Sequence, residues 1–352
     1  MPSRLRIAQV APLYESVPPP RYGGTERVVS YVTEELVRRG HDVSLYASAD
    51  SVTEARLVPF APKALRLDRP PDTMLPHFIE LEGVYAAAAD FDVIHAHTDY
   101  MTLPFARASA TPTLLTLHGR LDLPYLPALF ARYPEQPLVS ISDSQRAPFG
   151  DAVRWAGTVY HGIPAETYRF VERPGDYLAF VGRVSPEKGL DVAIRLAEAV
   201  GMPLRVGAKV DPIDQPYFDA VVRPLLASPL VEFLGEIDEA TKIELLGHAH
   251  ALVFPIDWPE PFGLVMVESL ACGTPVVARP GGSVSEIVMD GVTGFLGSRF
   301  EDLVRGVRAV ERLDRRACRA DVEARFSIGV MADGYEALYR RLLADGRRAR
   351  AA

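Results

Sequence analysis

Two glutamates with a glycine between them are the clearest candidates for chemistry in this sequence. Glu260 and Glu268 lie eight positions apart, and Gly263 falls at the expected start of a helix over residues 263–271. The unpaired amides and positive dipole end of a helix N-terminus suit a phosphate, and a carboxylate accepts hydrogen bonds from sugar hydroxyls. The pattern indicates a phosphate beside Gly263 with both glutamates near it. The alternative is structural: Glu260 partners the helix dipole, and Glu268 is a solvated helix residue.

Two cations follow an expected strand further upstream. The stretch 182–189 carries Arg183 and Lys188, and Pro186 suits the start of a helix. The two side chains could flank a diphosphate and neutralise the charge that grows as this group leaves. A surface turn with two exposed cations is the alternative.

Histidines occur at a strand end and in two His-x-His pairs. His118 follows an expected strand, where it could bond a sugar hydroxyl or transfer a proton; a structural histidine is the alternative. The pairs His95/His97 and His248/His250 have a spacing that can bind a metal, but no further ligands are evident. We expect a structural or substrate-adjacent role for both pairs and no metal site.

Short apolar runs alternate with helical patterns, which predicts parallel α/β sheets covered on both faces. The segment 162–176, with its prolines and charges, is the best linker between two series of strands. The chain is therefore expected to form two doubly wound, Rossmann-like domains. Ligands of such sheets bind beyond the carboxyl ends of the strands, and two sheets facing each other would form a deep cleft. The expected strands are 5–10, 43–47, 93–96, 114–117, 138–141, 158–160, 178–181, 204–207, 231–234, 251–255, 276–278 and 294–296.

Glycine spacing argues against several nucleotide motifs. No two glycines are separated by a single residue, and no lysine follows a glycine, so the dinucleotide fingerprint and the P-loop are absent. The pairs Gly23-Gly24 and Gly281-Gly282 instead fall at strand-to-helix junctions, where phosphate binding or a tight turn can explain them. Thr25 is the expected N-cap of the first helix. The segment 59–75 follows no pattern that predicts an element.

Composition narrows the class of protein further. The chain has 352 residues and a formal net charge of −8, which suits two domains and disfavours a nucleic-acid binder. It has no apolar run of membrane-spanning length, no signal-peptide pattern and only two cysteines, so we expect a cytoplasmic protein. The terminal basic residues Arg347, Arg348 and Arg350 are expected at a solvated helix end, with peripheral membrane contact as the alternative.

In order and spacing, these motifs resemble those of the GT-B glycosyltransferases of family GT4, the retaining nucleotide-sugar enzymes. The resemblance spans nearly the whole chain. One departure is His161, where many relatives carry asparagine. The stretches that carry the resemblance are 22–27, 95–97, 117–119, 140–146, 160–163, 182–189, 260–268, 271–278, 281–286 and 291–296.

The resemblance implies a role for each domain and each motif. An acceptor-side domain would span residues 1–165 and a nucleotide-sugar-binding domain residues 172–333, with a final helix in 334–352 packing back on the first domain. His118, Glu260, Arg183 and Lys188 would be catalytic. The implied donor-binding residues are Gly23, Gly24, Arg183, Lys188, Glu260, Phe262, Gly263, Leu264, Val265 and Glu268.

The implied reaction is transfer of a hexosyl group from a nucleotide diphosphate sugar, linked to UDP or GDP, with retention of configuration. Neither a metal ion nor a cofactor is expected. The acceptor would be a small molecule, a glycan or a lipid-linked compound, and the sequence leaves its identity and the oligomeric state open. Two alternatives remain: a nucleotide-sugar epimerase or hydrolase on the same fold, and a non-catalytic protein that binds nucleotide sugars.

Overall fold

The chain forms two compact units in the computed structural model, which describes residues 4–351. The first unit comprises the described residues up to Gly162 and those from Ile328 onward, and the second runs from Ile163 to Ser327. These boundaries differ from the expected ones at both junctions. The residues 328–333 belong to the first unit, because the final helix begins at Ile328 and not near Gly334.

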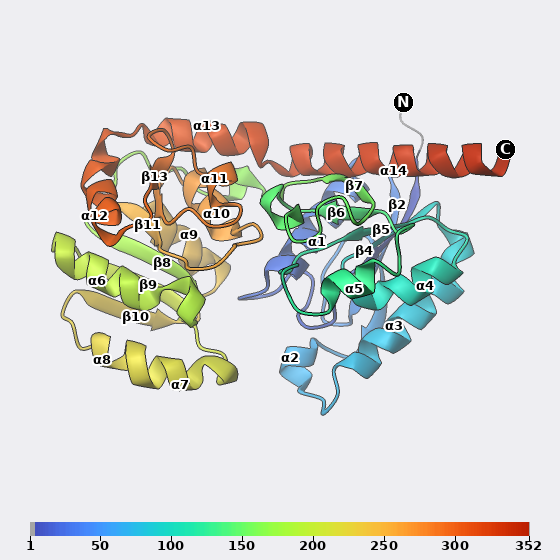
Figure 1. Ribbon diagram of the computed structural model, residues 1–352, viewed down its shortest axis with the longest axis horizontal. Helices are drawn as coiled ribbons and strands as arrows, with labels where there is room; N and C mark the ends of the chain where they lie inside the picture. The colour runs from blue at the N-terminus through green and yellow to red at the C-terminus, as the bar shows by residue number, and fades with distance from the viewer. Residues whose placement is uncertain (1–3, 352) are drawn as a thin grey trace. The chain divides into compact units, whose positions relative to one another are not determined.

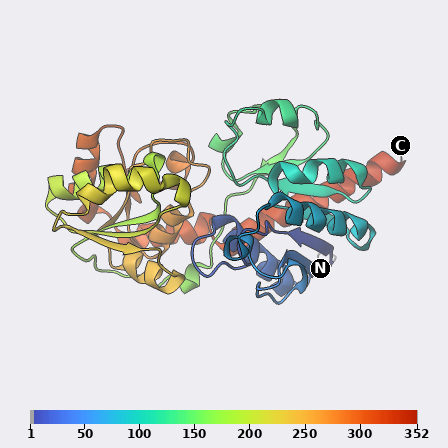
Figure 2. The same cartoon turned by 90° about the horizontal axis from the view of Figure 1, so that it is seen from below.

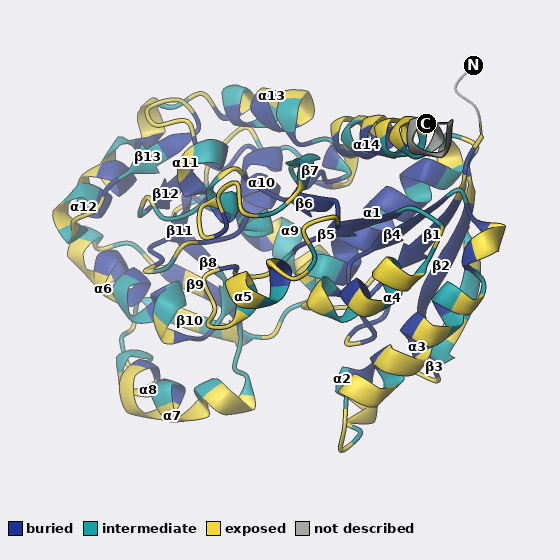
Figure 3. Ribbon diagram, turned by 45° about the vertical axis from the view of Figure 1, so that its right-hand side comes forward, coloured by how far each residue is buried: buried dark blue, intermediate teal, exposed yellow. Residues whose placement is uncertain are grey.

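The first unit is built on a parallel sheet (Figure 1). Its strand order is β3-β2-β1-β4-β5-β6-β7. Almost all side chains of β1, β2 and β4 are buried, as expected for strands covered on both faces (Figure 3). The strand order reverses between β1 and β4, which are adjacent. The strands are β1 (Arg6–Val10), β2 (Asp42–Ser48), β3 (Arg56–Ala61), β4 (Val93–Ala96), β5 (Thr113–Thr116), β6 (Leu138–Ser140) and β7 (Trp155–Thr158).

Helices of the first unit include two that lie side by side, α3 and α4 (Figure 2). Helix α1 begins two residues earlier than expected, with Gly23 and not Thr25 as its N-cap. It ends at Arg38, shortly before Gly40. The helices are α1 (Gly24–Arg38), α2 (Leu65–Asp68), α3 (Met74–Ala86), α4 (Leu103–Ala108), α5 (Leu126–Phe130) and α14 (Ile328–Ala351).

An edge strand and a short helix occupy the segment 59–75, which fitted no element in the sequence. β3 pairs with β2 at the edge of the sheet, so several of its side chains remain partly exposed. An edge strand also tolerates Pro59. β3 therefore lacks the continuous apolar run of a central strand, and the sequence pattern does not predict it.

The second unit contains a parallel sheet with the strand order β10-β9-β8-β11-β12-β13. This confirms the predicted architecture of two doubly wound α/β domains. Its main core fills the space between the sheet and the helices α6 and α12. The strands are β8 (Leu178–Arg183), β9 (Leu204–Lys209), β10 (Val231–Gly235), β11 (Ala251–Phe254), β12 (Val276–Ala278) and β13 (Gly294–Leu296).

Helices α9, α10 and α13 form a second packed group in this unit, in which α10 contacts both of the others (Figure 1). The helix expected to start at Pro186 is divided: a 3-10 turn, Pro186–Lys188, precedes α6. The helices are α6 (Leu190–Val200), α7 (Gln215–Tyr217), α8 (Arg223–Leu225), α9 (Glu239–Gly247), α10 (Leu264–Ala271), α11 (Val284–Ile287), α12 (Phe300–Ala309) and α13 (Arg315–Arg325).

The segment 162–176 is not a free linker. Ile163 is buried and forms a β-bridge with Ser327 in the second unit. Tyr168 is also buried, and its hydroxyl bonds glutamates of α9 and α10. Its prolines and charges resemble a linker, but its apolar side chains anchor the segment to the second unit.

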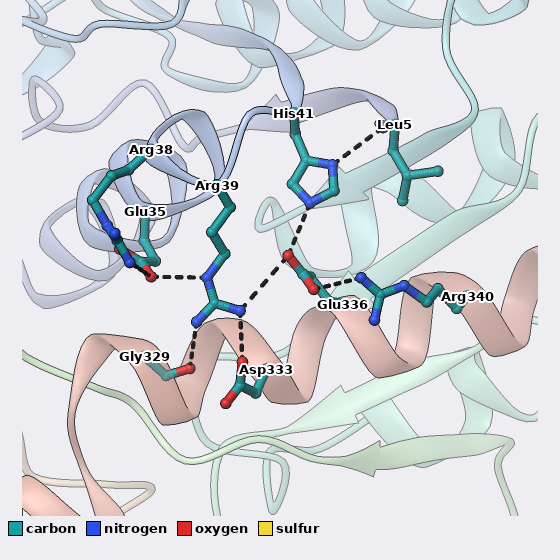
Figure 4. Close-up of polar contacts among 9 residues, drawn as sticks. All are labelled: Leu5, Glu35, Arg38, Arg39, His41, Gly329, Asp333, Glu336 and Arg340. Carbon is teal, nitrogen blue, oxygen red and sulfur yellow. Dashed lines mark hydrogen bonds and ion pairs between the residues drawn. The ribbon is translucent and has the colours of Figure 1, made fainter. Parts of the chain in front are cut away.

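Charged side chains hold α14 against the end of α1 (Figure 4). Glu336 Oε1 lies 2.9 Å from His41 Nε2. Arg39 donates to Asp333 Oδ1 at 2.6 Å and to the carbonyl of Gly329 at 3.0 Å. The last helix of the chain is therefore part of the first unit.

Within residues 4–351, no helix combines the length and apolar character needed to cross a membrane. The expectation about Arg347, Arg348 and Arg350 concerns side chains that lie outside the described part of the chain.

Candidate active-site residues

The loops after two neighbouring strands carry most candidate residues of the second unit. β8 and β11 are adjacent in the sheet although two strands separate them in sequence, so the strand order reverses between them. Ligands of doubly wound sheets bind at this point, beyond the carboxyl ends of the strands. Arg183 ends β8 and Lys188 follows it, while Glu260 and Gly263 follow β11.

An ion pair joins these two loops. Lys188 Nζ donates to Glu260 Oε2 at 2.5 Å, and Trp258 Nε1 donates to the same oxygen at 2.9 Å. The side chains of Lys188 and Glu260 are only 15% and 9% exposed, so water screens the pair weakly. Both bonds use Oε2, which leaves Oε1 of Glu260 able to accept a hydrogen bond from a ligand.

Main-chain packing brings the two loops together. The Asp257 amide donates to the carbonyl of Glu187 at 2.8 Å. Gly189 has a φ of 71°, and an added Cβ would lie 2.5 Å from the carbonyl oxygen of Pro255. Only glycine allows this approach, which places Lys188 beside Glu260.

The N-terminus of α10 lies directly after Glu260. Gly263 is the N-cap residue, with a φ of 79°. An added Cβ there would lie 2.6 Å from Met266 Cε. The amides of Leu264 and Val265 belong to the first helical turn, whose N–H groups have no acceptor within a helix. These amides and the Lys188 ammonium are suited to bind an anion.

The glycines Gly281 and Gly282 pack against the Glu260 loop. An added Cβ at Gly282 would collide with the main chain of Glu260. The Ser283 amide donates to the Glu260 carbonyl at 2.9 Å, and Ser283 Oγ donates to the carbonyl of buried Phe262 at 2.8 Å. The close approach of two main chains thus explains this glycine pair without a ligand.

Arg183 lies among carboxylates of its own unit. It donates to Glu187 Oε1 at 2.6 Å, and its Nε lies 3.4 Å from Asp214 Oδ2. Burial raises the pKa of Asp214, although the Arg183 charge opposes this shift. The guanidinium is one-third exposed, so it remains accessible from solvent.

Glu268 is buried in α10 and belongs to a different hydrogen-bonded group from Glu260. Its Oε1 accepts from Lys242 Nζ at 2.6 Å and from the Tyr168 hydroxyl at 3.2 Å. Lys242 also pairs with Glu239 at 2.9 Å. Glu268 is therefore not a solvated helix residue. Sequence reasoning missed Lys242, although a charge inside an apolar helix requires such a partner.

In the first unit, Gly23 and Gly24 end the loop that follows β1. An added Cβ at Gly23 would lie 2.8 Å from the Pro19 ring. The Arg27 guanidinium donates to the carbonyls of Pro19 and Arg21 at 3.0 and 2.8 Å. The loop is thus held close to the start of α1.

Glu26, in the first turn of α1, is a titratable residue that the sequence analysis missed. Its side chain is buried, and burial raises the pKa of its carboxyl to about 7, with a further contribution from the charge of Glu15. A carboxyl group beside Gly23 and Gly24 affects the charge of any phosphate site there. Only its position next to the glycine pair could have revealed it.

His118 follows β5 at one end of a buried series of polar side chains. Its Nε2 lies 2.8 Å from His97 Nδ1, and His97 Nε2 lies 3.0 Å from Gln9 Oε1. Gln9 and His95 both contact the Tyr339 hydroxyl of α14. Burial lowers the pKa of His118 to about 3. The imidazole of His118 is therefore neutral near pH 7.

The two His-x-His pairs differ in arrangement. His95 and His97 have ring centroids 4.1 Å apart and share the buried series just described. His248 is exposed, whereas His250 is buried beside the Val307 carbonyl, so these two diverge. Across the part of the chain that the structure describes, no group of three or more His, Cys, Asp or Glu residues could hold a metal ion.

A cavity of about 210 Å³ lies elsewhere in the second unit. Its lining includes His250 and Pro275, which directly precede β11 and β12, and Pro174, which lies in the segment before β8. This is the end of the sheet opposite to the Lys188–Glu260 pair. Arg315 in its wall donates to three main-chain carbonyls, so its charge stabilises the fold.

Solved structures define the class of protein. AviGT4, a glycosyltransferase involved in avilamycin A biosynthesis, is similar with a TM-score of 0.74 at 25% identity, over 97% of this chain and 98% of that one. HepE of Anabaena in complex with UDP-glucose has a TM-score of 0.72 at 19% identity, covering 97% and 100%. The protein is a glycosyltransferase of the GT-B fold.

Two family matches then identify its type. The family described as Glycosyltransferase Family 4 matches residues 22–154, and Glycosyl transferases group 1 matches residues 168–325. The protein therefore belongs to the glycosyltransferases with GT4-type domains, which confirms the resemblance. The D-inositol 3-phosphate glycosyltransferase of Mycolicibacterium smegmatis is 28% identical over 389 residues, covering 92% of this chain and 88% of that protein.

Proposed function

We propose that this glycosyltransferase moves a hexosyl group from a UDP- or GDP-sugar to an acceptor, with retention of configuration and without a metal ion. The Lys188–Glu260 pair beside the N-terminus of α10 carries this proposal. An ammonium group and helix amides bind an anion, and a carboxylate accepts from hydroxyl groups. A nucleotide diphosphate sugar offers both kinds of group within a few bonds.

We infer the steps of sugar transfer from the positions of these residues. As the bond between the anomeric carbon and the diphosphate breaks, Lys188 and the amides of Leu264 and Val265 stabilise the charge on the leaving oxygen. The acceptor oxygen forms its bond to the anomeric carbon on the same face, and its proton passes to the leaving diphosphate. Glu260 positions the sugar through its hydroxyls, and Arg183 and Glu268 bind the remainder of the donor.

Two comparisons suggest which substrates to test first. HepE is solved with UDP-glucose, and a relative is named for D-inositol 3-phosphate. We therefore propose UDP-glucose as the first donor and a phosphorylated polyol as the first acceptor. In the first unit, His118 and the loop ending at Gly24 would contact the substrates.

A thermal-shift series with UDP-glucose and GDP-mannose tests donor binding, because a ligand of the native state raises the melting temperature. We expect one of the two nucleotide sugars to raise the melting temperature of the wild type. The variant Lys188→Met should show neither this rise nor sugar transfer. Lys63→Met is the matched control, because Lys63 is exposed and its ion pair with Asp68, at 3.5 Å, is exposed as well. The double variant Lys188→Met/Glu260→Gln shows whether an unpaired buried charge causes any loss of stability.

The proposal fails if no nucleotide sugar stabilises the wild type, or if Lys188→Met transfers sugar at the wild-type rate. Product analysis by NMR distinguishes retention from inversion. The same spectra show whether the donor is transferred, epimerised or only hydrolysed. Activity that disappears with EDTA and returns with a divalent cation would contradict metal independence.

A further inference from the structure

A buried series of hydrogen-bonded side chains links the end of β5 to α14 within the first unit. The Gln9 amide nitrogen lies 3.3 Å from the Tyr339 hydroxyl, and Gln9 Oε1 lies 3.0 Å from His97 Nε2. His97 Nδ1 then lies 2.8 Å from His118 Nε2. Gln9, His97 and Tyr339 are at most 1% exposed, so water does not compete for these bonds.

The protons of this series can be assigned from its far end. Thr116 Oγ1 donates to the Tyr335 hydroxyl at 3.3 Å, so at 2.8 Å it accepts from His95 Nε2. His95 Nδ1 is then unprotonated and accepts from the Tyr339 hydroxyl at 2.7 Å. The oxygen of Tyr339 is left to accept from the amide of Gln9.

The orientation of the Gln9 amide determines the tautomers of two histidines. Because its nitrogen faces Tyr339, its oxygen faces His97 and accepts from His97 Nε2. His97 Nδ1 is then unprotonated and accepts from His118 Nε2. Burial lowers the pKa of His97 and His118, so both rings are neutral and each carries one proton.

We propose that Gln9, His97 and Tyr339 are positioning residues that hold His118 in the Nε2–H tautomer and make its Nδ1 a hydrogen-bond acceptor. This nitrogen is buried and has no hydrogen-bond partner among the described residues. A buried acceptor without a partner is costly, which is expected where a ligand completes the site. At the following residue, an added Cβ at Gly119 would meet nothing within 4 Å.

The identity of that ligand rests on the proposed function: a sugar or acceptor hydroxyl donates to His118 Nδ1. In the opposite tautomer this nitrogen would carry a proton, and two donors would face each other. Through Tyr339, α14 influences the tautomer of His118, which lies more than two hundred residues away in sequence.

NMR of the whole protein with 15N-labelled histidine tests the tautomer without any substrate. We expect His97 and His118, assigned from His97→Gln and His118→Gln, to show an unprotonated Nδ1 and a protonated Nε2. A coupling through the hydrogen bond between His118 Nε2 and His97 Nδ1 is also expected. A proton on Nδ1 of either ring would overturn the proposal.

Variants then connect the tautomer to activity. Gln9→Leu removes the acceptor of His97, so we expect the His118 Nδ1 signal to shift toward its protonated position. We also expect kcat/KM for UDP release from UDP-glucose to fall about tenfold, the effect of losing one hydrogen bond. Gln9→Glu keeps an oxygen beside His97 and should retain the wild-type tautomer.

Tyr85→Phe is the matched control for loss of a polar group. The Tyr85 hydroxyl lies 3.0 Å from Thr113 Oγ1 at the other end of β5, away from His118. This variant should keep the wild-type spectrum and activity within about twofold. A folded Gln9→Leu with wild-type signals and activity would refute the proposal. If no nucleotide sugar is a substrate, the proposed function fails, and the NMR result still decides the tautomer.

Discussion

Both glutamates of the Glu260/Glu268 pattern pair with a lysine in the second unit. Lys188 Nζ lies 2.5 Å from Glu260 Oε2, and Lys242 Nζ lies 2.6 Å from Glu268 Oε1. Removing one partner of a buried ion pair leaves an uncompensated charge, which costs about 3–5 kcal/mol. Each of these glutamates is therefore balanced by a lysine of its own unit, and a diphosphate bound at the proposed donor site would share Lys188 with Glu260.

A pH effect is expected from Glu26, whose pKa rises from 4.5 to about 7. Its contribution to stability is fully present below pH 4.5 and is lost as the pH rises through 7, because the buried side chain favours its protonated form. Glu26→Gln mimics that form. At pH 8 we expect the variant to be more stable than the wild type by up to roughly 3 kcal/mol, and at pH 4.5 equally stable.

Urea denaturation between pH 4.5 and 8 measures this difference. Glu54→Gln, a change at an exposed residue of the same unit, should leave the pH dependence unaltered. Parallel curves for the wild type and Glu26→Gln at every pH would contradict the assignment.

At the scale of elements, a variant at the N-cap of α10 tests whether this helix N-terminus binds the donor. Gly263→Ala places a Cβ on left-handed backbone, which costs about 1–2 kcal/mol, and crowds Met266. Gly201 has a φ of 69°, and an added Cβ there would meet nothing within 4 Å. Gly201→Ala therefore loses stability only through the left-handed backbone. Because Met266 Cε is the flexible end of a side chain and can move aside, we expect similar losses of stability, but weaker UDP-glucose binding only in Gly263→Ala. Calorimetry that shows equal donor affinity for the two variants would argue against α10 as the phosphate site.

The contact of α14 with α1 provides a second test at this scale. Burial opposes ionisation of Glu336, but bonds from His41 and Arg340 outweigh it and lower its pKa. Glu336→Gln should cost about 2 kcal/mol at pH 7. The difference should be lost as the pH falls through the folded-state pKa, because a depressed carboxyl pKa stabilises only above it.

Asp333→Asn is the control on the same helix. Its side chain is 72% exposed, whereas that of Glu336 is 9% exposed, and both contact Arg39. An exposed ion pair contributes about 0–1 kcal/mol. Thermal unfolding that shows equal losses for the two variants would mean that burial of Glu336 is not the cause.

For the whole molecule, the division into units predicts how fragments behave. The second unit is one continuous segment, Ile163–Ser327, whereas the first needs α14 from the end of the chain. We expect a fragment of residues 163–327 to unfold cooperatively and to bind UDP. A fragment of residues 1–162 should not fold, because the buried Tyr335 and Tyr339 are missing from its core.

Circular dichroism and calorimetry on both fragments check this prediction. Joining residues 328–352 to the first fragment through a short linker should restore cooperative unfolding. Cooperative folding of residues 1–162 alone would show that α14 is dispensable.

Local patterns predicted much of the fold. The strands 93–96, 276–278 and 294–296 agree with β4, β12 and β13. All residues of β4 and β12 are buried, and a short, mostly apolar run marks such strands. The partly exposed edge strand β3 lacks this signal. The last strand of the first sheet, β7, was expected at 158–160 and lies at Trp155–Thr158, where its residues are only partly buried.

The alternation of strands and helices and the motifs around Lys188, Glu260 and His118 can be predicted from the amino-acid sequence. These are properties of neighbouring residues, whose spacing and periodicity are readable along the chain. The pairing of Lys188 with Glu260, of Glu268 with Lys242 and of Gln9 with Tyr339 arises from the folding of the chain and is visible only in three dimensions. Such contacts join residues 26 to 330 positions apart, and a local pattern carries no information about partners that only the strand order and helix docking bring together.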